Sequence, residues 1–481
     1  MQSFLQLLST LMLLSLIAAC GDGASGDNSS TTDDPPGAND TAGSRQQFAM
    51  SLEEYLGSLY RPFSWSGPIR DPERDGVEIL DPTQFQPLDS STVDSLEMLL
   101  AERDIIMQIG GMGSAKNPDP NRVNEQFATY MDSIIADGGK LWRDAVYMRG
   151  QEVAALDGDH KVYWQIGNEI NAGSYLRNIN LYFERSNNDL LTIIPVYVEY
   201  FLAPTLQALH QVEADTGHPV RIALGSIAGF SNDNSALFLD TLLNYQIIGD
   251  YAPALAGARV YEWINLLTIH YSMNASEPDD PDRWRDVLVR SYEQWVGVKD
   301  IQGIWTTEEV GIRAAENGHG AGAALRVMVR YLDWISEFQY PGNTARWFYF
   351  GTTAGPTNQQ INDAMLQVEQ ILDDSALYYY DHQLNDSATL ESYAYRIGDS
   401  EGYLLTVSPI GNDNQSIETV AITLPPNTFE AEIAAWRYGN DGTSGATASL
   451  ISDSSGVQIH LSPAVELSES DTLLIHVDVH P

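Results

Sequence analysis

Residues Val162–Asn171 read Val-Tyr-Trp-Gln-Ile-Gly-Asn-Glu-Ile-Asn, and they carry the clearest fold signal in the chain. The first half of this segment is almost continuously apolar or aromatic, which is typical of a strand buried in a parallel sheet. The strand leads directly into Gly167-Asn168-Glu169, so Glu169 lies at its carboxyl end. In parallel α/β folds that end of the sheet carries the functional residues. The segment therefore predicts a parallel α/β fold with a glutamate in its functional site.

The sequence around this strand, from residue 48 to residue 374, alternates short β-rich runs with longer amphipathic segments. One amphipathic segment, 197–215, stops at Thr216-Gly217-His218-Pro219, a strong signal for a helix C-terminus. Alternating strands and helices predict a parallel sheet. The nearly even spacing of the later strands favours a closed (β/α)8 TIM barrel over an open sheet. The other expected strands are 59–65, 104–109, 221–224, 266–269, 303–307 and 346–350, and the other expected helices are 91–102, 281–298 and 321–338.

The last part of the chain, residues 375–481, has a different texture. Short runs of alternating apolar and polar residues are separated by turn sequences such as Gly411-Asn412-Asp413. This pattern predicts a C-terminal antiparallel β-sandwich domain after the barrel. Its expected strands are 393–397, 402–407, 419–424, 430–436, 457–461 and 472–477.

The charge balance excludes some partners. The 481 residues include 25 Lys and Arg against 66 Asp and Glu, a formal net charge of -41. Such a surface repels nucleic acid and anionic membranes, so neither is expected as a direct partner. The charge is compatible with a neutral substrate, and it is equally compatible with solubility in salty surroundings, where charges are screened.

The N-terminal region predicts that the protein is anchored to the bacterial cell envelope. The apolar run 4–19 ends at Cys20, the single cysteine, and is too short for a comfortable membrane span. It resembles the lipobox of bacterial lipoproteins, which implies that residues 1–20 are a signal peptide and that Cys20 is acylated, with Gly21 favouring the outer membrane. Because Met1-Gln2-Ser3 lacks Lys and Arg, an ordinary cleaved signal or an uncleaved anchor are the alternatives. Residues 21–47 are polar and predict a disordered tether.

Two adjacent glutamates follow another expected strand, in Gly303-Ile304-Trp305-Thr306-Thr307-Glu308-Glu309. Strict alternation would group Ile304, Thr306 and Glu308 on one face of that strand. Glu308 lies 308 − 169 = 139 residues after Glu169, the length of three strand–helix units at the spacing of this chain. Two carboxyl groups on opposite sides of a bond are the requirement for glycoside cleavage. The sequence therefore predicts that Glu169 and Glu308 share one site, with Glu309 as the competing second glutamate.

Both glutamate segments resemble the clan A glycoside hydrolases, TIM-barrel enzymes whose fourth strand ends in Asn-Glu and whose seventh carries a glutamate. The resemblance implies that Glu169 is the acid/base, that Asn168 binds the sugar 2-hydroxyl, and that Glu308, in its Trp-x-x-Glu and Thr-Glu context, is the nucleophile. It covers residues 59–477, and the trailing β-sandwich is similar to families 39, 30 and 51.

The same resemblance names four further substrate-binding residues. His270 and Tyr271 would line the site at the sixth strand, although the chain reads His270-Tyr271-Ser272 where many members read His-x-Tyr. Trp347 would be the sugar platform of the eighth strand and Arg61 the arginine that steadies the nucleophile. A structural role is the alternative for His270, and core packing is the alternative for Trp347.

Together these features predict a retaining glycoside hydrolase that acts on an oligo- or polysaccharide without a metal or organic cofactor. The alternative from another class is a non-catalytic, surface carbohydrate-binding lipoprotein on the same barrel. A transglycosylase would use the same residues and would differ in excluding water from the site.

Overall fold

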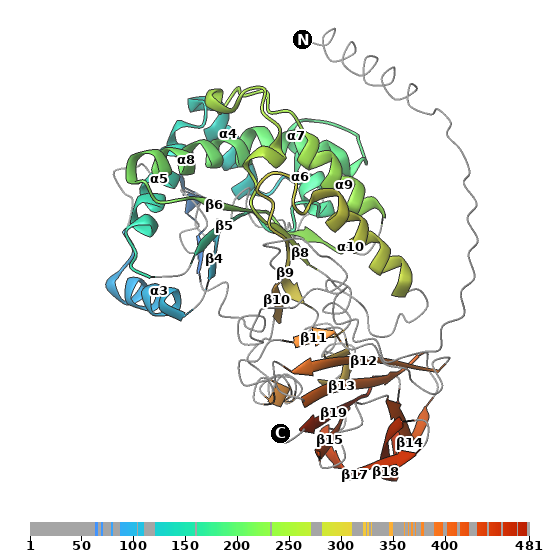
Figure 1. Ribbon diagram of the computed structural model, residues 1–481. Coiled ribbons are helices and arrows are strands. Elements are labelled where there is room, and N and C mark those ends of the chain that lie inside the picture. The colour runs from blue at the N-terminus through green and yellow to red at the C-terminus, as the bar shows by residue number, and fades with distance from the viewer. Residues whose placement is uncertain are drawn as a thin grey trace, which may run out of the picture. The chain divides into compact units, whose positions relative to one another are not determined.

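In the computed structural model (Figure 1), the first strands described are residues 63–65, 69–70 and 78–79. The other residues described are 87–102, 104–109, 121–158, 161–230, 233–270, 281–309, 346–349, 377–379 and, with short gaps, 321–329, 360–371 and 389–478. Only the backbone is described for several strand segments, among them 63–65, 69–70, 78–79, 306–309, 346–349 and 377–379. The expected signal peptide with Cys20 and the expected tether lie outside the described residues.

Within the described residues, seven parallel strands follow one another in space in the order of the sequence. The first sheet has the order β1-β4-β5-β6 and the second β10-β9-β8-β7, with every pair parallel. The two sheets are joined by a bridge between Ala223 and Leu266, where the Leu224 amide donates to the Leu266 carbonyl at 2.8 Å. After a short break β7 follows β6 and pairs with β8. The strands are β1 Phe63–Trp65, β4 Ile105–Ile109, β5 Val162–Ile166, β6 Arg221–Leu224 with β7 Ile227–Ala228, β8 Leu267–His270, β9 Ile304–Glu309 and β10 Arg346–Tyr349. A short hairpin, β2 Ile69–Arg70 with β3 Glu78–Ile79, lies between the first two.

Helices connect these strands and pack against them, as Figure 1 shows for α4 to α9. Their ends follow local signals: the Asn124 side chain caps α4 by accepting from the Phe127 amide, and Gly217, at φ 74°, ends α8 where the sequence predicts. The helices are α3 Ser90–Glu102, α4 Glu125–Asp137, α5 Lys140–Ala154, α6 Gly173–Tyr182, η3 Leu190–Thr192, α7 Ile193–Tyr197, η4 Val198–Leu202, α8 Ala203–Thr216, α9 Asp233–Asn244, η5 Pro253–Leu255, η6 Val260–Trp263 and α10 Pro281–Trp295.

Alternate residues of the strands enter two different cores. Ile105, Met107 and Trp164 join the large cluster that contains the helices, whereas the residues between them form a cluster built only from this strand layer. That inner cluster consists of Ile106, Tyr163, Ala223, Leu266 and Trp305, each 0% exposed. Burial on both sides explains why the strands read as continuous apolar runs.

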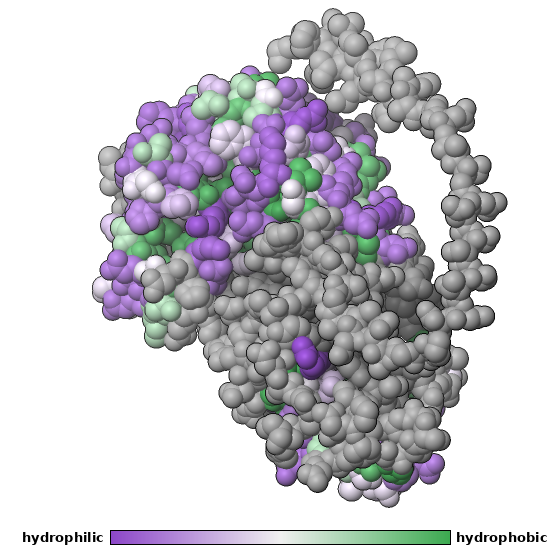
Figure 2. Space-filling model, viewed as in Figure 1, coloured by the Kyte–Doolittle hydropathy of each residue, from purple (hydrophilic) through white to green (hydrophobic). Residues whose placement is uncertain are grey.

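One helical stretch passes the length and hydropathy test for a membrane span. The continuous run Leu190–Thr216 is the only such candidate within the part of the chain that the structure describes, and 67% of its apolar window is buried. Leu202, Leu206 and Leu209 in this run are 0% exposed and belong to the large cluster. The run is therefore packed as a core helix. On the face shown in Figure 2, the helical surface is mainly hydrophilic with scattered apolar residues.

The C-terminal part forms two antiparallel sheets that share one core. The six-stranded sheet has the order β11-β12-β13-β19-β15-β16 and the three-stranded sheet β14-β18-β17. Leu405 and Ile475 from the first sheet pack with Ile459 and Leu461 from the second. The strands are β11 Leu377–Tyr379, β12 Leu390–Ile397, β13 Gly402–Pro409, β14 Gln415–Ile422, β15 Glu432–Gly439, β16 Gly442–Ala446, β17 Ala448–Asp453, β18 Gly456–Leu467 and β19 Thr472–Asp478.

The other face of the six-stranded sheet is covered as well. Leu404 belongs to the large cluster together with Leu325 and Val329, so β13 is buried at all its positions. The Arg326 guanidinium, 1% exposed, pairs with Glu391, and the Thr472 hydroxyl donates to the Gly322 carbonyl at 2.6 Å. The segment 321–329 is thus fastened to the C-terminal sheet by both apolar and polar contacts.

Candidate active site

The site is built around the turn that follows β5. Gly167 has φ 91° and Glu169 has φ 49°, so both residues adopt left-handed backbone conformations. A non-glycine residue held in this region is uncommon and often marks a functional site. At Gly167 a side chain would also meet Ile170, because an added Cβ would lie 2.9 Å from its Cγ2. The turn therefore requires glycine at one position and imposes an uncommon conformation on the glutamate.

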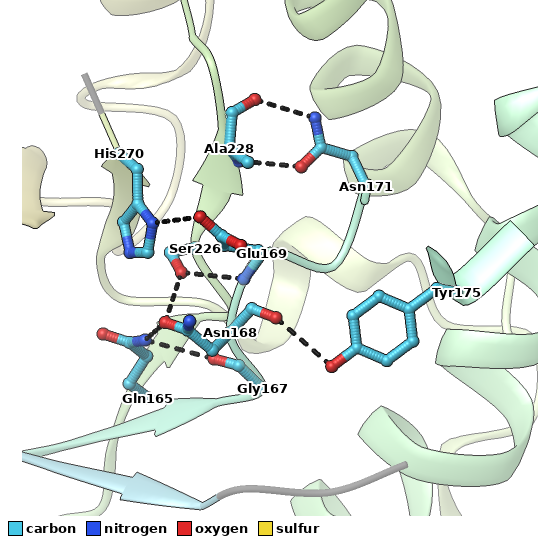
Figure 3. A network of polar contacts seen from close by, with 9 residues as sticks. All are labelled: Gln165, Gly167, Asn168, Glu169, Asn171, Tyr175, Ser226, Ala228 and His270. Carbon is cyan, nitrogen blue, oxygen red and sulfur yellow. Dashed lines mark hydrogen bonds and ion pairs between the residues drawn. The ribbon is translucent and has the colours of Figure 1, made fainter. Parts of the chain in front are cut away.

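The break between β6 and β7 holds this turn (Figure 3). The Ser226 hydroxyl accepts from the Glu169 amide at 3.1 Å and donates to Asn168 Oδ1 at 3.0 Å. Gly225 permits the approach, because an added Cβ would lie 2.2 Å from the Ile166 carbonyl oxygen. The turn and the strand break therefore fit each other through both backbone and side-chain atoms.

Asn171, which follows the turn, binds the backbone of β7 through its side chain. Its Oδ1 accepts from the Ala228 amide at 2.7 Å and its Nδ2 donates to the Ala228 carbonyl at 2.9 Å, in the manner of a strand partner. The Tyr175 hydroxyl donates to the Asn168 carbonyl at 3.3 Å. Burial, and then the charge of Glu169, raise the pKa of Tyr175 to about 12, so this hydroxyl keeps its proton at neutral pH.

His270 meets Glu169 from the end of β8. The distance from His270 Nδ1 to Glu169 Oε1 is 3.2 Å, and Figure 3 shows the two side chains pointing toward each other. The His270 side chain is 7% exposed, whereas that of Glu169 is 47% exposed. The carboxyl group of Glu169 thus contacts a buried imidazole, and nearly half of the Glu169 side chain is exposed. Three residues predicted to share a site, Asn168, Glu169 and His270, are brought together.

The backbone of β9 contains an irregularity at the two competing glutamates. Arg346 pairs with Trp305 and Trp347 with Thr306, but Tyr349 pairs with Glu309, so two steps along β10 match three along β9. The register shifts there by one residue, as at a β-bulge, a feature common beside active sites. Since the bulge interrupts strict alternation, the grouping of Ile304, Thr306 and Glu308 expected from the sequence does not extend through residues 307 and 308.

Several predicted residues cannot be assigned contacts. Arg61 and Tyr271 lie outside the described residues, and for Glu308, Glu309 and Trp347 the structure describes the backbone without the side chains. Their roles stay predictions. Among the residues that are described, no group of three His, Cys, Asp or Glu side chains is arranged to hold a metal ion.

Sequence reasoning did not include Ser226, Asn171, Gln165 and Tyr175 in the site. The contacts of Ser226 and Asn171 join residues 57 or 58 positions apart, which no local pattern reveals. One signal was available: Gly225-Ser226 directly follows the apolar run of β6, the position at which a parallel strand delivers functional residues.

The fold resembles solved structures of glycoside hydrolases. A Paenibacillus polymyxa xyloglucanase of family 44, solved with xyloglucan, matches 91% of this chain and 98% of its own, with a TM-score of 0.51 and 9% identity. A family 44 endoglucanase from Clostridium acetobutylium matches 88% and 93%, with a TM-score of 0.47 and 10% identity. The chain has a clan A glycosidase-like fold. No protein-family model and no curated protein sequence matches it.

Proposed function

We propose that this protein is a retaining glycoside hydrolase in which Glu169 is the acid/base and Glu308 the nucleophile. The observation that carries the proposal is the assembly of Asn168, Glu169 and His270 at the carboxyl ends of β5 and β8, on a glycosidase-like fold. Parallel barrels carry their active sites at that end. The proposal includes closure of the seven parallel strands, with one more strand, into a (β/α)8 barrel, and a β-sandwich formed by the two C-terminal sheets.

The acid/base role rests on the surroundings of Glu169. An acid/base must reach the glycosidic oxygen and later a water molecule, and the half-exposed carboxyl group of Glu169 is open to both. His270 Nδ1, 3.2 Å from Oε1, fixes the orientation of the carboxyl group from the buried side. In the first step Glu169 protonates the leaving oxygen as the glycosidic bond breaks. In the second it takes a proton from the water that attacks the anomeric carbon.

The choice of Glu308 as nucleophile rests on the register of β9. Trp305 belongs to the inner cluster, so unbroken alternation would give the inner position to Glu309. The bulge changes this, because Glu309 pairs with Tyr349 and therefore shares the register of Thr306. Residues 307 and 308 together oppose one residue of β10, so the inner position falls to one of these two, and only Glu308 of the pair has a carboxyl group. Its carboxylate would attack the anomeric carbon and form the glycosyl-enzyme. Water would then attack the same carbon, break the bond to Glu308 and release the sugar.

The substrate we propose is an uncharged oligo- or polysaccharide, in keeping with the net charge of -41. The location we propose is the bacterial cell envelope, through a lipid on Cys20. Replacement of Cys20 by Ala with labelled palmitate as the readout tests the location, since loss of label from the membrane fraction is the expected result.

The function is tested by turnover of aryl β-glycosides and polysaccharides, with Glu308→Ala beside the matched control Glu309→Ala. Glu308→Ala should reduce turnover by at least about 10⁴-fold, because the covalent step is lost, whereas Glu309→Ala should retain most of the activity. The anomer first released, followed by NMR, should keep the configuration of the substrate. Equal turnover by wild type and Glu308→Ala would remove Glu308 from the mechanism. Saccharide binding without turnover by the wild type would instead favour the non-catalytic carbohydrate-binding alternative.

A further inference from the structure

The amide of Asn168 has a defined orientation. Its Oδ1 receives the hydroxyl of Ser226 at 3.0 Å and, at 3.5 Å, Nε2 of Gln165. Its Nδ2 donates to no residue within the described part of the chain, and it is not among the polar atoms sealed from solvent without a partner. The oxygen of the amide therefore faces the protein, and its N–H groups are left for solvent or a ligand.

Two backbone groups impose this orientation independently. The carbonyl of Gly167 can only accept, so Gln165 must present Nε2 to it, at 3.1 Å, and the same NH2 group then faces Asn168. The amide of Glu169 can only donate, so Ser226 must accept from it, at 3.1 Å, and its single hydroxyl proton is left for Asn168. Each chain of hydrogen bonds ends with a donor facing Asn168 Oδ1, so both chains indicate the same orientation of the Asn168 amide.

Burial removes the alternatives. Ser226 and Gln165 are both 0% exposed, so neither can exchange its partner for bulk water at low cost. Figure 3 shows both side chains on the opposite side of Asn168 from Tyr175. The stronger of the two contacts to Asn168 comes from Ser226, which also holds the backbone of Glu169 in its left-handed conformation.

We propose that Ser226 is a positioning residue that fixes the Asn168 amide as a hydrogen-bond donor to the substrate and holds the Glu169 turn in place. This inference rests on the proposed function, in which the oxygen that Asn168 contacts is a sugar hydroxyl next to the scissile bond. Ser226 itself touches no reacting atom. It acts by removing the second orientation of the amide, in which Oδ1 rather than Nδ2 would face the substrate, and by accepting a hydrogen bond from the Glu169 backbone amide.

The experiment compares Ser226→Ala, Asn168→Ala, the double variant and Ser291→Ala. Ser291 is an equally buried serine, 4% exposed, whose hydroxyl donates to the Val287 carbonyl inside α10, so its variant controls for loss of a buried hydroxyl. Ser226→Ala should lower kcat/KM by about tenfold, the effect of one buried hydrogen bond, and Ser291→Ala should leave it unchanged. Because Ser226 acts partly through Asn168, the loss in the double variant should be smaller than the product of the two single losses. Losses that multiply fully, or equal behaviour of Ser226→Ala and Ser291→Ala, would overturn the inference.

A second readout does not depend on turnover. Crystal structures of the wild type and Ser226→Ala should differ in the Asn168 amide, which loses its contact across the strand break, or in the Gly167–Glu169 turn. If the wild type cleaves no glycoside, the proposed function fails, and these two structures still decide the positioning role. An Asn168 amide and a Glu169 backbone that stay in place without the Ser226 hydroxyl would contradict it.

Discussion

The parallel strands carry two successive layers of inward residues, and the two layers differ in kind. Closer to the amino ends of the strands, Tyr163, Ala223 and Trp305 are apolar or aromatic and completely buried. At the carboxyl ends of the same strands, Ser226 and His270 are buried polar residues that contact Asn168 and Glu169. One backbone arrangement therefore supports both a dry core and a polar site.

The difference indicates that the buried apolar residues of each strand contribute mainly to stability, and that the polar residues at its carboxyl end contribute mainly to the site. The apolar layer needs volume and close packing, as in the tilted contact of Tyr163 and Trp305 with ring centroids 4.9 Å apart. The polar layer needs direction, because each hydrogen bond there fixes a donor or an acceptor. Substitutions in the first layer should therefore affect folding, and substitutions in the second should affect turnover.

Glu169→Gln, in the polar layer, should show the largest difference between its effect on turnover and its effect on stability. We expect turnover to fall by about 10²–10⁴-fold, equivalent to about 3–5 kcal/mol of barrier, because the group that donates and accepts the proton is gone. The free energy of unfolding should change little, since the side chain is half exposed. Steady-state kinetics and urea unfolding of the same preparation measure both. Loss of stability with intact turnover would show that Glu169 stabilises the fold and does not take part in catalysis.

The matching substitution in the apolar layer is Trp305→Ala. Removing this side chain, 0% exposed, should cost about 3–5 kcal/mol of unfolding free energy, since a cavity replaces its contacts with Tyr163. Urea unfolding followed by circular dichroism measures the change. A cost below about 1 kcal/mol would show that the inner cluster is not close-packed.

Gly225→Ala probes the boundary between the layers. The added methyl group would lie 2.2 Å from the Ile166 carbonyl oxygen, so the strand break must move away from the turn. We expect a cost of about 1–3 kcal/mol in stability and a loss of turnover, because Ser226 moves with it. Gly173→Ala is the control, since nothing lies within 4 Å of an added Cβ there. Equal stability and turnover for the two variants would contradict the close fit.

At neutral pH the smallest effect expected is that of Tyr175→Phe, which removes one hydrogen bond of 3.3 Å, and its pH dependence is confined to high pH. Since burial raises the pKa of Tyr175 to about 12, the unfolded state releases this proton first, near pH 10. The resulting stabilisation is complete below pH 10 and is lost as the pH rises toward 12, by about 3 kcal/mol at most. The midpoint of urea unfolding should therefore fall less steeply between pH 10 and 12 in Tyr175→Phe than in the wild type. Parallel slopes would show that Tyr175 titrates normally.

The sequence predicted the apolar layer better than the polar one. The strands 162–166 and 221–224 have the predicted bounds because double burial makes them continuous apolar runs. The strands β16 and β17 were missed, since Gly442–Ala446 is rich in glycine, serine and threonine and has no alternating pattern. Short-range signals also placed Asn168, Glu169 and His270 at strand ends.

What local patterns could not reveal was how these residues are held. The contacts of Ser226 depend on a left-handed turn meeting a strand break 57 residues later, which only the packed fold brings together. The bulge in β9 shows the same limit, because strict alternation applied to Trp305 would give Glu309 the inner position. In both cases the irregular backbone lies at the carboxyl ends of the strands.

The most direct test of the account is the separation of the Glu169 and Glu308 carboxyl groups in a crystal structure of the protein. A retaining site requires the two groups to face each other at about 5–5.5 Å. Carboxyl groups more than about 10 Å apart, or at opposite ends of the strands, would contradict it, since no glycosidic bond could lie between them.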